Sequence, residues 1–576
     1  RTGWCNASND SSDAGRSAPM AVRGWWSYLA IAATSVVLRA IVPMDIVWGS
    51  GHDSQLQVVV ARNIMSGQWL GFELFADSWI GSQWNLALAK GVGYPLFLVL
   101  VKPLGLTPVA AAQLLYLLGA LMVARILHGW VNGRFGVFVF GVLAFSPALY
   151  GGEFSRVYRN HLVAAMALIT LGLVLRCSNH VRQAFTASTT LKSTLGVRYF
   201  VLVTLTGVVM SLSWLTRLDV HWIAITAGLA WMVVGWPSLL TRATLLRVVA
   251  PTLALLGAGF AVVPLAVATA NFRQYDIFAL DDYGSGPIAE TQLLLSRIAA
   301  EPVHPLVHVS AEQRAKAYAV SPTLASVAAQ LEDPESGWKS NPSNTGEAAG
   351  WFSWELRDAP VRAGKVATLR ELHDFFAAVE RELSLACESN RLDCSGVGEF
   401  APGVRFITQV DKASFVDEYV RSMMVHLEGA GAANFFNITP LGIPELDTLW
   451  TTTVNGIDTV RSPTQVTQPA ELTSRLYFMA TVVALLLLLA AVILRRPASR
   501  TLLLFALACV LGTLLNAFIV TWFSLEIGVT TRDNAGYLFA SQSYLYVALL
   551  LAIGAFLQPH FGGPQRLRGV DIPESA

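Results

Sequence analysis

Long apolar segments alternate with short polar segments along most of this chain. Ten of the apolar segments approach the roughly 20 residues that a helix needs to cross a bilayer. They cover residues 27–47, 108–128, 134–150, 159–176, 199–214, 220–236, 248–270, 474–494, 501–523 and 537–557. The pattern predicts an all-α polytopic membrane protein with about ten transmembrane helices.

Residues 49–107, between the first two of these segments, follow a different pattern. A helix starting near Ser54 would carry apolar residues on one face, namely Leu56, Val59, Val60 and Ile64. Such a face is typical of a helix that lies in the membrane interface. The apolar run 96–101 follows Pro95 and is too short to span a bilayer. It predicts a second interfacial helix.

Charge is distributed unevenly, although the formal net charge is only +1. Residues 271–473 carry 15 Lys/Arg and 27 Asp/Glu, whereas the rest of the chain carries 25 and 12. Basic residues gather in alternate short loops, and the positive-inside rule assigns these loops to the cytoplasm. The residues concerned are Arg125, Arg134, Arg176, Arg182, Lys192, Arg198, Arg242, Arg247, Arg495, Arg496, Arg500, Arg566 and Arg568. The acidic segment is then extracytoplasmic, provided that 96–101 does not cross the membrane.

The chain is therefore expected to lie in the plasma membrane and to have five parts. These are a disordered cytoplasmic tail (1–24), a seven-span membrane module (25–270), an extracytoplasmic and mostly helical domain (271–473), a three-span segment (474–558) and a second cytoplasmic tail (559–576).

Local signals give the extracytoplasmic domain more detail. Ser310-x-x-Gln313 and Thr368-x-x-Glu371 both have the pattern of capping boxes at helix starts, and Ser414 is expected to cap a further helix that runs through Met424. Cys387 and Cys394 are the only closely spaced cysteines and lie on the predicted oxidising side, so we expect them to form a disulfide.

Several classes of function have no support in the sequence. No Cys/His pattern has zinc-site spacing, and the sequence His-Glu-x-x-His is absent. Neither a Walker A nor a Rossmann glycine pattern occurs, which counts against a nucleotide-driven pump. Nucleic acid is not an expected partner, because no basic patch interleaved with aromatic residues is present.

Asp53 is the sharpest candidate for chemistry. A carboxylate held at a membrane surface can take a proton from an acceptor hydroxyl group. Aspartate is also a common N-cap, and Asp53 directly precedes the predicted interfacial helix. The residue by itself leaves the catalytic and the capping interpretations equally open.

Basic residues also lie on the predicted outer side, where Lys and Arg are usually scarce. They are Lys90, Arg156, Arg159, Arg217 and Arg532. As a set they are candidates for binding a lipid phosphate. The alternative for any one of them is snorkelling or a local ion pair, as between Arg217 and Asp219 or between Arg532 and Asp533.

Other polar and aromatic residues on this side are candidate substrate ligands. His52, His161 and His221 lie at span ends, where each is more often an interface residue than a metal ligand, and Tyr94 precedes the second interfacial helix. Trp351 and Trp354 could stack on a sugar. They could equally form the core of the outer domain or its contact with the membrane surface.

These residues, taken in order, resemble the GT-C membrane glycosyltransferases, in particular protein O-mannosyltransferase-like and aminoarabinose-transferase-like enzymes. The resemblance covers residues 25–270. The matching stretches are Asp53 with Ala61-Arg62 and Ser66-Gly67-x-Trp69, the segment from Lys90 to Gly105, the turn Ser155-Arg156-Val157-Tyr158-Arg159-Asn160, and Leu215-Thr216-Arg217.

The resemblance implies inverting transfer of a sugar from a polyprenyl-phosphate donor, with Asp53 as the base and the basic set holding the phosphate. Many relatives have a second acid where this chain has Ser54, and often an Asp near Asn160 and His161. The resemblance therefore implies no definite cofactor. The missing acidic residues weigh against a divalent metal in particular. Whether the acceptor is a glycan, a lipid or a protein is open.

Two functions of other classes fit the same composition. A lipid or glycolipid transporter or flippase without chemistry predicts charged residues along a path within the spans. Only Arg39 lies clearly inside a span, which argues mildly against transport. A cell-surface binding scaffold would need no convergence of acidic and basic residues near the membrane.

Overall fold

The computed structural model describes the chain in separate stretches. They are residues 18–41, 52–67, 69, 88, 90–150, 154, 158–187, 196–217, 220–235, 248–283, 286–301, 306–339, 345–394, 412–427, 472, 475–483, 485–486, 489–490, 493, 500–526 and 535–557. Over these residues the fold is all-helical, as predicted, and the only strand-like pairing is a single bridge between Ile298 and Cys394.

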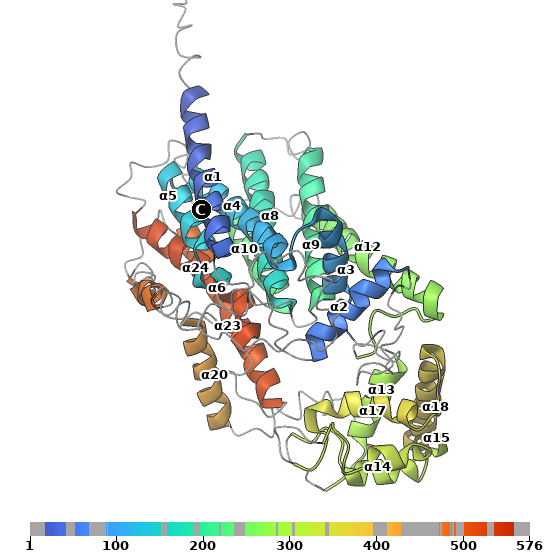
Figure 1. Cartoon of the computed structure of the whole chain (residues 1–576). Helices are drawn as coiled ribbons and strands as arrows, with labels where there is room; N and C mark the ends of the chain where they lie inside the picture. Colours follow the sequence, from blue (N-terminus) through green and yellow to red (C-terminus); the bar gives the residue numbers. More distant parts are fainter. Residues whose placement is uncertain are drawn as a thin grey trace, which may run out of the picture.

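Six of the described helices are long and apolar enough to cross a membrane. They are α4 (Pro108–Trp130), α8 (Asn160–Ala187), α9 (Val197–Thr216), α12 (Ala250–Tyr275), α23 (Arg500–Glu526) and α24 (Ala535–Leu557). Helices α4, α8, α9 and α12 pack in that order, and Figure 1 shows them in the upper half of the molecule. Each of the six corresponds to a predicted apolar segment.

Four further elements belong to the helical bundle, and two of them correct a prediction. They are α1 (Ala18–Ile41), α5 (Gly133–Ala144), α6 (Pro147–Tyr150) and α10 (His221–Gly235). The segment 134–150, predicted as one span, is divided between α5 and α6. Pro147 causes the break, because it has no backbone N–H and disfavours helical geometry at Ser146.

The two helices predicted between the first two spans are present as α2 (His52–Met65) and α3 (Gly93–Val101). A short 3₁₀ turn, η2 (Lys102–Leu104), extends α3. The start of α3 packs against the end of α9 without intervening side chains. A Cβ atom at Gly91 would clash with the carbonyl oxygen of Leu215, and one at Gly93 would lie 2.5 Å from Oγ1 of Thr216. Glycine is therefore required for this close approach.

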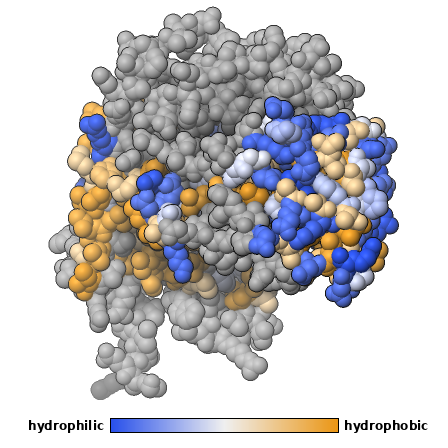
Figure 2. Space-filling view, turned by 90° about the horizontal axis from the view of Figure 1, so that it is seen from below, coloured by the Kyte–Doolittle hydropathy of each residue, from blue (hydrophilic) through white to orange (hydrophobic). Residues whose placement is uncertain are grey.

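Residues 286–394 form a helical unit at the lower right of Figure 1. Its helices are α13 (Pro287–Arg297), α14 (Ala311–Tyr318), α15 (Pro322–Ala325), α16 (Ala328–Leu331), η6 (Ala349–Trp351), α17 (Phe352–Arg362) and α18 (Leu369–Glu388). Leu356, Leu372 and Phe376 are fully buried in its core. Figure 2 shows hydrophilic residues over this unit and hydrophobic residues on the opposite side of the molecule, over the helical bundle.

The predicted caps are present, although one is incomplete. Ser310 and Gln313 form the reciprocal capping box at the start of α14. At the start of α18, Thr368 accepts a hydrogen bond from the backbone N–H of Glu371, as predicted. The carboxylate of Glu371, however, accepts from the N–H of Ala367 instead of Thr368. The second site is therefore a single cap rather than a full box.

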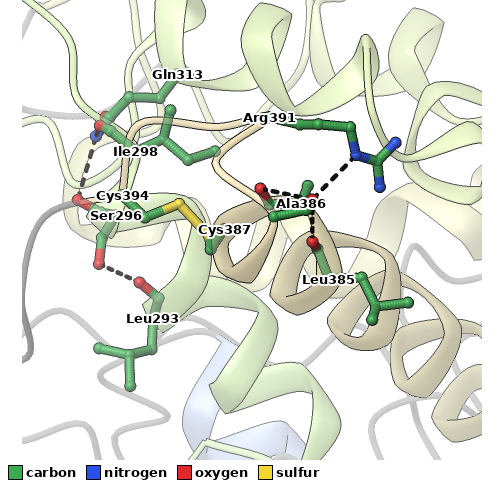
Figure 3. The surroundings of a disulfide bond; sticks show 10 residues. Leu293, Ser296, Ile298, Gln313, Leu385, Ala386, Cys387, Arg391 and Cys394 are labelled. Carbon is green, nitrogen blue, oxygen red and sulfur yellow. Dashed lines mark hydrogen bonds between the residues drawn. A yellow bond between two sulfur atoms is a disulfide. The ribbon is translucent and has the colours of Figure 1, made fainter.

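The predicted disulfide between Cys387 and Cys394 is confirmed, with Cα atoms 5.5 Å apart. Figure 3 shows the bond closing the turn that follows α18. The N–H of Ala299 donates to the carbonyl of Asp393 at 2.8 Å, next to the bridge between Ile298 and Cys394. The disulfide thus holds the end of α18 beside the segment that leaves α13.

Helix α20 (Lys412–Leu427) begins two residues before Ser414, so Ser414 is not its cap. Although it lies in the acidic segment, α20 packs against α23 and α24, as Figure 1 shows. The Ser422 and Thr521 hydroxyls are 2.7 Å apart, and Nε2 of His426 is 2.7 Å from Oγ of Ser541. Polar contacts of this kind fix the position of α20 along the two long helices.

Candidate functional site

Arg217 lies at the centre of the candidate site, where α9 ends. Its side chain is buried, with 3% of its surface exposed. Its Nη1 atom donates to Oδ1 of Asn160, the first residue of α8, at 3.0 Å. The guanidinium carbon lies 4.4 Å from the ring centroid of Tyr537 on α24. A hydrogen bond and an aromatic face together hold the cation where three helix ends meet.

Arg159 belongs to the same group of side chains. Its Nη2 atom is 3.3 Å from the hydroxyl of Tyr158 and can donate to it. The hydroxyl of Tyr158 is 2.9 Å from that of Tyr537. Arg159 and Arg217 are therefore joined through two tyrosines, and two of the predicted phosphate ligands are brought together at one end of the bundle.

Tyr94 and His161 extend this group toward α3. The hydroxyl of Tyr94 lies 3.3 Å from Nε2 of His161, and both side chains are fully buried. Burial raises the pKa of Tyr94 well above its ordinary value, so its hydroxyl stays protonated. The pair places the N-terminal end of α3 beside the start of α8.

Lys90 precedes α3 and contacts the helical unit of residues 286–394. Its Nζ atom lies 4.7 Å from the ring centroid of Trp354. Trp354 stacks on Trp338 with centroids 6.0 Å apart, and the ring of Tyr283 is 4.9 Å from it. Trp354 therefore contacts the segment before α3, a role that the sequence did not suggest for the tryptophans. Trp351 lies at the start of α17 and is partly exposed.

Asp282 is a buried residue of this region that the sequence argument missed. Its carboxylate accepts from Nε of Arg357 at 3.0 Å and lies 2.7 Å from Nε2 of His373, while its backbone N–H donates to the Leu88 carbonyl at 3.0 Å. Burial alone would raise the pKa of Asp282, but Arg357 and His373 outweigh it and lower the pKa below its usual value. The signal available in the sequence was the acidic pair Asp281-Asp282, which follows the predicted span 248–270 after ten residues.

Asp53 lies in the first turn of α2, which begins one residue earlier at His52. The interpretation of Asp53 as the N-cap of a helix starting at Ser54 is therefore corrected, because the backbone becomes helical before that position. A carboxylate in the first turn still complements the helix dipole. The side chains of His52 and Asp53, and the residues Arg156 and Arg532, lie outside the described residues.

The part of the chain that the structure describes contains no group of three His, Cys, Asp or Glu side chains that could hold a metal ion. Asn160 accepts a hydrogen bond from Arg217. A neutral amide meets the guanidinium there, so the positive charge of Arg217 is not cancelled by this contact.

No protein-family model, curated protein or solved structure matches this chain.

Proposed function

We propose that this chain is an integral-membrane glycosyltransferase. It would move a sugar from a polyprenyl-phosphate donor to an acceptor hydroxyl on the extracytoplasmic face, with inversion at the anomeric carbon. The observation that supports this most directly is the joining of Arg159 and Arg217 through Tyr158 and Tyr537. Two cations from different helices meet at one end of an apolar bundle, and a membrane lipid phosphate is the anion expected at that depth.

The donor phosphate would be bound by Arg159 and Arg217, with Lys90, Arg156 and Arg532 as the further predicted ligands. Asn160 orients Arg217 without neutralising it, because an amide oxygen carries no formal charge. As the bond from the anomeric carbon to the phosphate oxygen breaks, negative charge grows on the leaving polyprenyl phosphate. Fixed cations stabilise that charge more than they stabilise the intact donor, which lowers the barrier.

Asp53 would act as the general base. It accepts the proton of the acceptor hydroxyl while that oxygen attacks the anomeric carbon and displaces the phosphate. A common location for these groups is part of the proposal, and contacts between the helices that carry or adjoin them support it. Helix α2 packs against α3, the start of α3 packs against the end of α9, and Arg217 at that end binds Asn160 of α8.

The proposal includes the ten-span topology derived from charge, with both termini in the cytoplasm and residues 271–473 outside. The connections among α3, α8, α9, α24 and the outer helical unit then all lie on the extracytoplasmic side. The positive-inside rule supports this orientation.

Incubating the purified protein with a panel of polyprenyl-phosphate sugars and acceptors tests the proposal. We expect release of free polyprenyl phosphate together with a new glycoside. Transport without chemistry would instead move intact donor across a vesicle membrane and release none. Movement of intact donor with no released polyprenyl phosphate from any sugar in the panel would refute the enzymatic proposal.

Replacement of Asp53 by Asn separates catalysis from helix stability. Asn keeps the size of the side chain but is a far poorer proton acceptor. Loss of the charge near the N-terminus of α2 costs only about 0.3–1 kcal/mol. We expect Asp53→Asn to fold and bind donor, and to lose transfer by about 10²–10⁴-fold in a single-turnover assay. A transfer rate within a few fold of the parent would remove Asp53 from the mechanism.

A further inference from the structure

A second group of basic residues surrounds a pocket at the opposite end of the bundle from the candidate site. The pocket has a volume of about 690 Å³ and lies among the end of α4, the later part of α8 and the start of α9. Its polar lining residues are Arg125, Trp130, Arg176, Asn179, His180 and Arg198. The proposed glycosyltransferase site uses none of them.

The charge around this pocket is not balanced by acidic groups. Arg125, Arg176 and Arg198 come from three different helices, and within the described part of the chain no carboxylate forms an ion pair with any of them. The adjoining segments 124–136, 176–198 and 236–247 contain no Asp or Glu at all. The positive-inside rule explains basic residues in these loops, but it does not require three arginines to converge on one pocket.

The neighbouring side chains are arranged to hold an anion. The guanidinium carbon of Arg125 lies 4.6 Å from the ring centroid of Trp25, which limits its freedom. The indole Nε1 of Trp130 donates to Oδ1 of Asn179 at 3.4 Å. That contact uses the amide oxygen of Asn179, so the amide NH₂ group is the part that can donate to a ligand.

One edge of the pocket is apolar and faces away from the protein. Val197, Val201 and Leu205 recur every four residues on α9 and have 78%, 57% and 44% of their surfaces exposed. Val197 and Val201 line the pocket, and Leu205 continues the same face along the span. An acyl chain attached to a bound headgroup could lie along this face.

We infer that the pocket is a binding site for a phosphate group, with Arg125, Arg176 and Arg198 as its cationic ligands. A lipid headgroup and a soluble phosphate share this chemistry, because both present anionic oxygens to guanidinium groups. The inference does not depend on the proposed transfer reaction, since it concerns other residues at the other end of the molecule.

The test uses the full-length protein in detergent and measures ligand binding by native mass spectrometry. Phosphatidylglycerol, phosphatidylcholine and inorganic phosphate are titrated separately. The test variant carries both Arg176→Gln and Arg198→Gln, because these two side chains are exposed and their loss leaves the core intact. The matched control is Arg134→Gln, which removes an exposed arginine outside the pocket at the same end of the bundle.

We expect the parent and the control to bind phosphatidylglycerol with the same affinity and the double variant to bind it at least about 10-fold more weakly. Preference for phosphatidylglycerol over inorganic phosphate would identify a lipid headgroup as the source of the phosphate. The reverse preference, with the same dependence on the two arginines, would identify a soluble phosphate. Equal binding of every ligand by parent, control and double variant, or no binding by the parent, would overturn the inference.

Discussion

At the residue scale, the contacts of Arg217 illustrate how this chain holds a cation with little access to water. The amide of Asn160 and the ring of Tyr537 are two of its contacts. Both contacts orient the guanidinium. A guanidinium held in one orientation at a helix end is suited to binding a phosphate group.

Replacement of Arg217 by Lys tests this role while keeping the charge. Lysine cannot reproduce the planar guanidinium that contacts Asn160 and Tyr537 together. We expect Arg217→Lys to fold and to bind a polyprenyl-phosphate sugar about 10-fold more weakly, as measured by isothermal titration calorimetry. The matched control is Arg273→Lys, at an exposed position near the end of α12. Equal donor affinity in both variants would assign Arg217 a structural role only.

Short-range features of single residues were predictable from the sequence, whereas long-range partners were not. The Cys387–Cys394 bond and the Ser310 capping box depend on spacings of a few residues. The contact between Arg217 and Asn160 joins positions 57 residues apart, and Tyr537 lies in the last described helix. Nothing in the local sequence of Tyr537 distinguishes it from the other aromatic residues of the apolar segments.

At the element scale, hydrophobic periodicity predicted where helices occur but not which helices pack together. The segment that forms α20 was predicted as a helix of the outer domain, and its contacts with α23 and α24 include those of Ser422 and His426. Two such polar residues on an otherwise mixed helix do not identify their partners. The division at Pro147 was readable from the sequence, but the apolar run around it outweighed the proline in the prediction.

The buried histidine of α20 gives this element a pH dependence. Burial lowers the pKa of His426 from 6.5 to about 4. In the unfolded chain His426 therefore takes up a proton below about pH 6.5, whereas in the folded protein it does so only near pH 4. Stability is lost as the pH falls through this window, by up to about 3 kcal/mol for a shift of this size at about 1.4 kcal/mol per pH unit.

Thermal unfolding of the detergent-solubilised protein between pH 7 and pH 4 measures this effect. We expect His426→Gln to flatten the decline in Tm between pH 6.5 and 4, because glutamine does not titrate. The control is His221→Gln, which changes an exposed histidine at the start of α10 and should leave the decline unchanged. A decline in Tm that is identical in both variants would contradict the assignment to His426.

At the scale of the whole molecule, the helical unit of residues 286–394 is joined to the helical bundle at the candidate site. Asp282 binds the Leu88 carbonyl through its backbone and Arg357 through its carboxylate, and the ring of Trp354 lies against Lys90. Breaking a buried ion pair such as that of Asp282 and Arg357 typically costs about 3–5 kcal/mol. The unit is thus fixed next to Lys90, a predicted phosphate ligand.

The orientation of the molecule in the membrane is the prediction on which the glycosyltransferase proposal depends. If the positive-inside assignment holds, Arg134 faces the cytoplasm and Glu335 faces outward. Both positions are exposed, so a cysteine at either would be accessible.

Cys177 and Cys509 are buried and Cys387 is bonded to Cys394, so only Cys5 must first be replaced by Ser. In that background, Glu335→Cys should react with a membrane-impermeant maleimide added to intact cells. Arg134→Cys should react only after permeabilisation. The opposite pattern would place Arg159 and Arg217 on the cytoplasmic side, and the glycosyltransferase proposal in its extracytoplasmic form would fail together with the topology.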